Sequence, residues 1–166
     1  MVKSVLTETQ KGKLAQDLLA QVCLIGSNGK ISVALPMVDD EAIDLIFYLR
    51  GLSEKTLFAQ VKSRWTSSEG VKGGKFRTQV RKASFHARDN YYLIFVAYDE
   101  DKLQLVQPLW FVPSTEFVRL TKGQKQAKRI VFESRFDSND MWKPYRLNLR
   151  ELASSIIEYL CGASVV

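Results

Sequence analysis

Residues 91–98, Y-Y-L-I-F-V-A-Y, constrain the fold most, because this run is apolar on both of its alternating faces. A strand with two apolar faces has no side to offer to water, so it belongs in the middle of a sheet. The turn D-E-D-K follows it and leads into a second strand-like run over residues 103–112, in which Pro108 predicts an edge position or a bulge. We therefore expect a sheet built around residues 91–98.

One helix is expected near each end of the chain. Residues 7–24 have an apolar stripe at helical spacing, and Thr7 with Gln10 matches the capping-box pattern at its start. The last helix has Asn148 as a predicted N-cap, Glu151 three residues later and an apolar stripe behind them. Both helices are long enough to pack against the predicted sheet.

Alternating patterns between these helices predict further strands. Residues 30–36 read as one strand, and residues 43–65 read as a long hairpin that turns near R-G-L-S-E-K. The polar, glycine-rich residues after Trp65 predict a surface loop, and residues 79–88 a short helix. A helical turn at residues 113–120 and a strand at residues 129–135 follow. We predict a single α/β domain over residues 1–166, with a mixed β-sheet flanked by helices.

Composition narrows the functional classes. Lys and Arg total 24 against 18 Asp and Glu, a net charge of +6, which favours a polyanionic partner such as nucleic acid. A single histidine and two distant cysteines exclude a histidine-based triad and a zinc site of ordinary spacing. The longest apolar run is too short to span a bilayer, so we expect a cytoplasmic protein with no membrane partner.

Three polar residues interrupt the apolar hairpin. Gln60 and Lys62 share one face of the second strand because side chains alternate with period two. If the turn is centred near Leu52 or Ser53, cross-strand partners have numbers that sum to about 104 or 106. Asp44 then lies opposite Gln60 or Lys62. The hairpin thus predicts an acid, an amide and an amine on one face.

Such a cluster suits a divalent metal and a phosphodiester. A carboxylate oxygen, an amide oxygen and an adjacent backbone carbonyl are hard ligands of the kind that Mg²⁺ takes. The metal lowers the pKa of a bound water, and a lysine can orient that water or stabilise charge on the phosphorane. The alternative is a solvated strand face with an ordinary salt bridge, worth less than about 1 kcal/mol.

The same residues resemble a known family. Pro36 and Asp44, followed sixteen positions later by Q-V-K at residues 60–62, are similar to the motif of the PD-(D/E)xK nuclease superfamily, in its QxK variant found in some homing endonucleases. The resemblance covers roughly residues 10–65 and includes the first helix, where K-G-K-L-A-Q places Gln16 at the position of a common Glu. It implies a restriction-endonuclease-like core, with Asp44 and Gln60 as metal ligands and Lys62 as the catalytic lysine.

Two glutamines depart from the family's commonest pattern. Gln60 replaces a Glu, and Gln16 replaces the helix Glu, so each removes a negative charge from the metal's surroundings. Asp17 and Asp40 are close in sequence and could compensate, although Asp17 points about a third of a turn away from Gln16. These departures predict weaker metal binding than an all-carboxylate site would have.

The most basic part of the chain follows the second hairpin strand. Its cations interleave with aromatic residues, which favours a surface that tracks a phosphate backbone. We expect these side chains to bind DNA: Arg64, Lys72, Lys75, Arg77, Arg81 and Lys82. A second basic group at residues 122–129 is interpreted as a solvated linker.

Together these features favour a Mg²⁺-dependent DNA endonuclease, with Mn²⁺ as a possible substitute. Cutting both strands of a duplex favours a homodimer or homotetramer, because one domain covers one strand. A second reading keeps the fold and the DNA-binding surface but has weak or no catalysis because of the two glutamines. A third reading is a toxin, defence or interaction module in which the positive charge is incidental.

Overall fold

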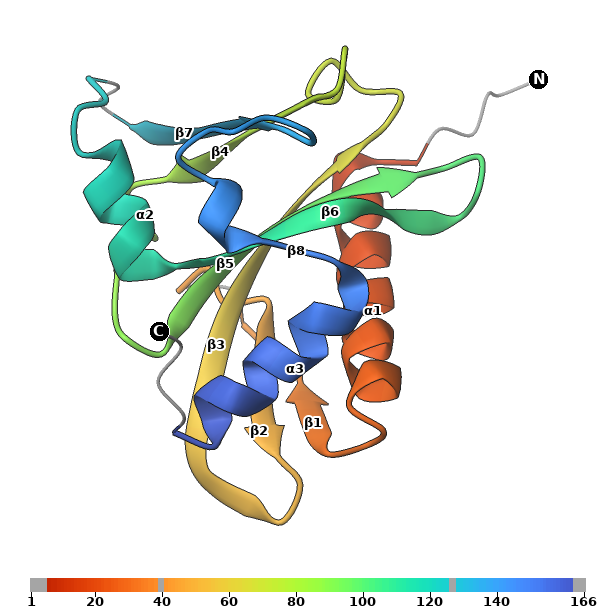
Figure 1. Ribbon diagram of the computed structural model, residues 1–166, viewed down its shortest axis with the longest axis vertical. Coiled ribbons are helices and arrows are strands. Elements are labelled where there is room, and N and C mark those ends of the chain that lie inside the picture. Colours follow the sequence, from red (N-terminus) through yellow and green to blue (C-terminus); the bar gives the residue numbers. More distant parts are fainter. Residues whose placement is uncertain (1–5, 39–40, 126–127, 163–166) are drawn as a thin grey trace.

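The computed structural model describes residues 6–38, 41–125 and 128–162, and Figure 1 traces its elements. The first half of the chain contains α1 (Glu8–Gly26), β1 (Ile31–Ala34), β2 (Leu45–Leu49), β3 (Leu52–Trp65) and β4 (Lys75–Arg81). The second half contains β5 (Tyr91–Asp99), β6 (Gln104–Pro113), α2 (Ser114–Thr121), β7 (Arg129–Arg135), a 3₁₀ turn (Lys143–Tyr145), β8 (Arg146–Leu147) and α3 (Leu149–Leu160).

The main sheet has six strands in the order β1-β2-β3-β5-β6-β8. The β3–β5 pair is parallel and every other neighbouring pair is antiparallel, so the sheet is mixed. A separate antiparallel pair, β4–β7, lies at the upper end in Figure 1. The predicted fold class, a mixed β-sheet flanked by helices, is confirmed.

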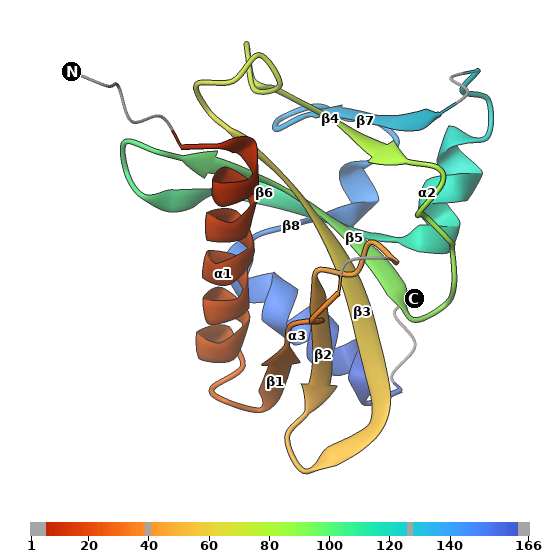
Figure 2. The same cartoon turned by 180° about the vertical axis from the view of Figure 1, so that it is seen from behind.

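Two apolar clusters lie on the two faces of this sheet. One joins α1 and α3 to the sheet through residues such as Leu19 and Leu152. The other joins the opposite face to β4, β7 and α2 through Phe76, Phe132 and Phe117. Residues 91–98 are buried throughout and alternate between the two clusters, which confirms the central position predicted for this strand. Figure 2 shows α1 beside the main sheet from behind.

Local signals placed both long helices correctly. Thr7 and Gln10 form the predicted capping box, in which the Gln10 backbone N–H donates to Thr7 Oγ1 at 3.2 Å. Asn148 caps α3 by accepting from the backbone N–H of Glu151 at 3.0 Å. Both cysteines are free thiols, and burial raises the pKa of Cys23 to about 12. No helix of the described ranges is both long and apolar enough to cross a membrane.

Two details differ from the sequence-based expectations, and at Pro108 one of two predicted alternatives is observed. The short helix predicted over residues 79–88 is wrong, because β4 continues to Arg81 and turns follow it. The basic residues assigned to a loop after Trp65 belong partly to β4, which includes Lys75, Arg77 and Arg81. Near Pro108 the β5–β6 register shifts between Phe95 and Ala97, so the bulge is observed. An edge position is not, since β8 pairs with β6.

Candidate active site

The candidate site lies where β3 extends beyond the end of its neighbour β2. The last paired positions of these strands are Leu45 and Ala59, whereas β3 pairs with β5 from Phe58 to Trp65. Residues 60–65 therefore have β5 along one edge and no strand of the described sheet along the other. This exposed edge is where the sequence predicted the polar cluster.

Asp44 is fixed to β3 immediately before β2 begins. Its backbone N–H donates to the Ala59 carbonyl at 2.8 Å, and its Oδ2 accepts from the Val61 backbone N–H at 2.6 Å. The observed register sums to 104 at Leu45 and Ala59, which is one of the two predicted values. These two bonds hold the Asp44 carboxylate against the β3 backbone between Gln60 and Lys62.

Gln60 lies below the surface. Its side chain is 5% exposed, and its Oε1 is buried without a hydrogen-bond partner. A buried acceptor without a partner costs about 1–3 kcal/mol, and such groups in native proteins call for an explanation such as a bound ion. Gln60 lines neither of the cavities at this edge.

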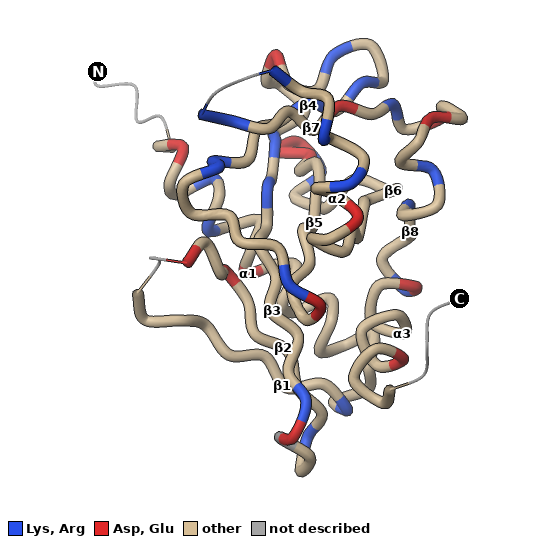
Figure 3. Tube along the Cα trace, turned by 90° about the vertical axis from the view of Figure 1, so that its left-hand side faces the viewer, with Lys and Arg blue, Asp and Glu red and all other residues tan. Residues whose placement is uncertain are grey.

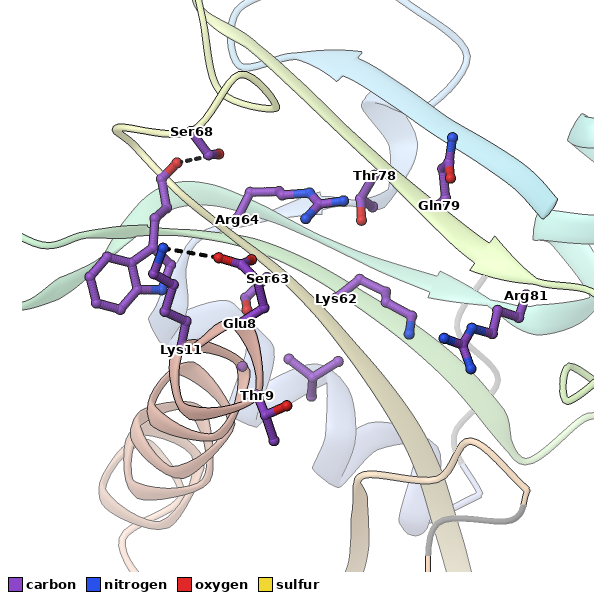
Figure 4. A pocket seen from close by; sticks show the side chains of 13 residues that line it. Glu8, Thr9, Lys11, Lys62, Ser63, Arg64, Ser68, Thr78, Gln79 and Arg81 are labelled. Carbon is purple, nitrogen blue, oxygen red and sulfur yellow. Dashed lines mark hydrogen bonds and ion pairs between the residues drawn. The ribbon is translucent and has the colours of Figure 1, made fainter. Parts of the chain in front are cut away.

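Lys62 is half-buried and borders two cavities that share residues of α1 and β3. The first cavity, of about 500 Å³, contains Asp44, Lys62 and Gln16 in its wall. The second, of about 480 Å³, extends from Lys62 to Arg64 on β3 and to Arg81 on β4. Figure 4 shows Lys62 and Arg81 directing their nitrogens into this second space from opposite strands. Because Val61 and Lys62 belong to both walls, the two cavities adjoin each other along β3, and we refer to them together as the cleft.

Next to Asp44, the helix α1 places the amide of Gln16, whereas its carboxylate in the cleft, Glu8, belongs to the first turn of the helix. Gln16 Nε2 donates to the Asp44 backbone carbonyl at 2.5 Å, so Gln16 supports the segment that positions Asp44. Asp17 is paired with Lys13 at 2.7 Å and lines neither cavity, so it does not replace the missing charge. Asp40 lies outside the described residues. Within the described ranges no group of three or more His, Cys, Asp and Glu side chains could hold a metal ion.

The six predicted DNA-binding residues separate into two groups. Arg64 and Arg81 line the second cavity beside Lys62. Arg77 lines a shallower hollow above it, where Arg64 Nε donates to the Arg77 carbonyl at 3.3 Å. The remaining three lie on exposed backbone outside these cavities: Lys72, Lys75 and Lys82.

Sequence reasoning missed several residues of the cleft. Glu8, Thr9 and Lys11 come from the first turn of α1 and line the second cavity. The Lys11 ammonium lies 5.2 Å from the centre of the Trp65 ring and 2.9 Å from Glu8. Gln79 of β4 faces the same cavity. Only the capping signal at Thr7 marked this helix end, and nothing local connects it to β4.

Comparisons with known proteins agree with this architecture. No protein-family model matches the chain, and no curated protein matches it in sequence. Its structure is similar to the solved structure of a bacterial homing endonuclease, I-Ssp6803I, with a TM-score of 0.55 and 20% sequence identity. The match covers 95% of this chain and 97% of that chain. Likeness at this identity establishes a shared fold, over nearly the full length of both chains.

Proposed function

We propose that the chain is a metal-dependent endonuclease that hydrolyses DNA phosphodiester bonds, with a PD-(D/E)xK site in its QxK form. One observation carries the proposal. The Asp44 carboxylate, bonded to the Val61 N–H, stands between a buried, unpaired Gln60 oxygen and Lys62, at the wall of a cationic cleft. The fold shared with a homing endonuclease supports the same conclusion.

The donor set fits a small hard cation. Asp44 and Gln60 would hold Mg²⁺, or Mn²⁺ in its place, because carboxylate and amide oxygens are the ligands that these ions prefer. A cation beside Gln60 Oε1 would give this buried acceptor the partner that it lacks in the protein alone. Gln60 and Gln16 bring no charge, so we expect weak binding that depends on phosphate oxygens to complete the coordination shell.

The chemistry divides between the ion and the protein. When bound, the cation supplies a water of lowered pKa and neutralises charge on the phosphate. Lys62 borders the same cavity as Asp44, where its ammonium group would orient the attacking water and stabilise charge on the phosphorane. The water loses a proton to solvent as its oxygen forms a bond to phosphorus, the bond to the leaving deoxyribose oxygen breaks, and that oxygen takes up a proton from solvent. Gln16 would keep the Asp44 backbone in place during this exchange.

The DNA backbone would lie along the cleft. Arg64 and Arg81 border it beside Lys62, and cations on two sides of a groove attract a phosphodiester chain and release its counterions. The described part of one copy presents one such cleft, so cutting both strands of a duplex favours a symmetric homodimer or homotetramer.

Supercoiled plasmid gives the simplest test of catalysis. We expect purified protein to nick plasmid in Mg²⁺ or Mn²⁺ and to lose this activity in EDTA. Asp44→Asn, which keeps an oxygen for the Val61 N–H, and Lys62→Ala should each remove activity. The matched control is Lys30→Ala with Arg50→Ala, two exposed cations in the turns that precede β1 and follow β2, and it should cut like the wild type. These turns lie at the lower end of Figure 1. Equal nicking by all variants would contradict the proposal.

A DNA-binding protein without catalysis is the second candidate. It is favoured by the Gln16 amide, which donates to the Asp44 backbone, and by the described residues, which contain no group of three or more His, Cys, Asp and Glu side chains that could hold a metal ion. Salt-sensitive DNA binding together with intact plasmid in every divalent metal would support this alternative. Absence of binding to duplex, branched or single-stranded nucleic acid at low salt would favour an interaction module instead.

A further inference from the structure

The pair β4–β7 has one buried face and one outward face. Burial alternates along both strands, so Phe76, Val80 and Phe132 point inward. The outward positions are Lys75, Arg77, Gln79 and Arg81 on β4, with Arg129, Val131, Glu133 and Arg135 on β7. Five of these eight residues are basic and one is acidic, so this outward face is strongly cationic. Figure 3 shows Lys and Arg gathered at this end of the molecule.

The outward face tolerates unfavourable charge pairs. Lys75 lies directly opposite Arg135, and Arg81 directly opposite Arg129. Like charges at opposed positions of a sheet are destabilising, so folding alone does not account for this arrangement. At one end each cation has a carboxylate partner, because Lys75 is bonded to Glu133 at 3.0 Å and Arg135 lies 3.6 Å from Asp137. At the other end, no ion pair of the described residues involves Arg81 or Arg129. A polyanionic ligand would relieve the repulsion between Arg81 and Arg129.

The inward face holds the ribbon rigidly against the main sheet. Phe132 stacks on Phe95 of β5 with ring centres 3.7 Å apart, and Phe76 packs on Trp110 of β6 at 5.4 Å. At one point on the outward face, Arg129 donates to Gln79 Oε1 at 2.8 Å and so orients both side chains. Gln79 and Arg81 also line the cavity of Lys62, so the outward face and the cleft form one continuous surface (Figure 4).

We propose that the outward face of the β4–β7 ribbon enters the major groove of duplex DNA and reads base edges there. A two-stranded ribbon fits that groove, which is about 12 Å wide. Arg77, Gln79 and Arg129 would contact bases, since arginine recognises guanine and glutamine recognises adenine by paired hydrogen bonds. Lys75 and Arg135 at one end would bind the flanking phosphates. The inference rests on the proposed DNA substrate and adds the groove and the recognition element.

Binding without divalent metal separates this inference from catalysis. The probe is a fluorescent 40-base-pair duplex of mixed sequence, titrated in EDTA at several salt concentrations and followed by anisotropy. We expect Arg77→Ala with Arg129→Ala to weaken binding about tenfold or more with little change in the salt slope, because base contacts rather than phosphate contacts are lost. Lys30→Ala with Arg50→Ala, which removes the same charge elsewhere on the surface, should change affinity less than twofold. Melting temperatures check that both double variants fold.

Groove competition on the wild type needs no variant. Methyl green occupies the major groove and netropsin the minor groove, so methyl green should displace the protein and netropsin should not. Equal binding by the ribbon variant and its control would overturn the inference, as would displacement by netropsin alone. Wild-type binding with intact plasmid in every metal would reject the proposed catalysis but leave the ribbon inference standing. No binding to the duplex at all would reject both.

Discussion

The two halves of β3 form one continuous strand with two kinds of surroundings. Residues 52–59 pair with β2 and contain Leu57 and Ala59, which are fully buried in the cluster with α1 and α3. Residues 60–65 pair with β5 and border the cleft, and they contain Gln60, Lys62 and Arg64. The first half of β3 therefore packs in the core, and its second half, which begins where β2 ends, carries the proposed catalytic and DNA-binding side chains. Substitutions in the two halves should separate stability from activity.

The first half should control stability. Leu57→Ala removes a fully buried side chain and leaves a cavity, so we expect the free energy of unfolding to fall by about 2–5 kcal/mol. The measurement is urea denaturation followed by circular dichroism. Activity per folded molecule should persist at low temperature, where the variant is still native. A loss below about 1 kcal/mol would mean that the first half is not part of the core.

The second half should control activity. Lys62→Ala is expected to slow plasmid nicking on the order of 100-fold or more, because it removes the cation beside the reacting phosphate. Because Lys62 is only half-buried, the free energy of unfolding of the Lys62→Ala variant should differ from that of the wild type by less than about 1 kcal/mol. The nicking rate and urea denaturation are measured on the same preparation. If the nicking rate and the free energy of unfolding both fell strongly, the two halves of β3 would not differ in the way proposed.

Gln60 lies at the boundary between the halves and should respond to metal. At a Mn²⁺ concentration ten times the dissociation constant, the wild type should gain about 1.4 kcal/mol of stability. Gln60→Leu should lose this gain, and Gln60→Glu should increase it by adding a charged ligand. Without metal, Gln60→Leu should be neutral or slightly stabilising because it removes an unpaired buried oxygen. Thermal melts with Mn²⁺ and with EDTA give the comparison, and equal shifts in all three proteins would contradict it.

The smallest effect is expected just beyond the end of β3. Hydrogen bonds from Ser67 and Thr66 lower the pKa of Glu100 to about 2. The stabilisation that comes from this shift is present above the unfolded pKa near 4.5 and is lost as the pH falls toward 2. Glu100→Gln should therefore cost less than about 1 kcal/mol at pH 7. The difference from the wild type should shrink between pH 4.5 and pH 2 in urea denaturation, and a pH-independent difference would contradict the assignment.

Local signals in the sequence were enough to place the ends of α1 and α3 and the hairpin register. Capping depends on residues three apart, and a hairpin pairs neighbouring residues, so Asp44 could be placed beside Gln60 and Lys62 before any coordinates. Continuous apolar character in residues 91–98 likewise predicted a central strand. Each of these features is encoded within a short stretch of chain.

Features that depend on distant residues could not be predicted. Lys75–Arg81 alternates as a strand does, but its partner Arg129–Arg135 lies about fifty residues later, and the basic group at residues 122–129 was interpreted as a linker. Arg129 in fact opposes Arg81 in β4. The burial of Gln60 depends on the neighbouring strand β5, which lies about thirty residues later, so no local pattern indicates that its oxygen lacks a partner.

Anomalous diffraction from a crystal soaked in Mn²⁺ tests the central claim most directly. The account predicts one strong peak about 2.0–2.6 Å from both an Asp44 carboxylate oxygen and Gln60 Oε1, with Lys62 bordering the same site. A well-occupied Mn²⁺ elsewhere, with both of these oxygens unliganded, would contradict the account, as would density that shows no ion beside Asp44 at saturating Mn²⁺.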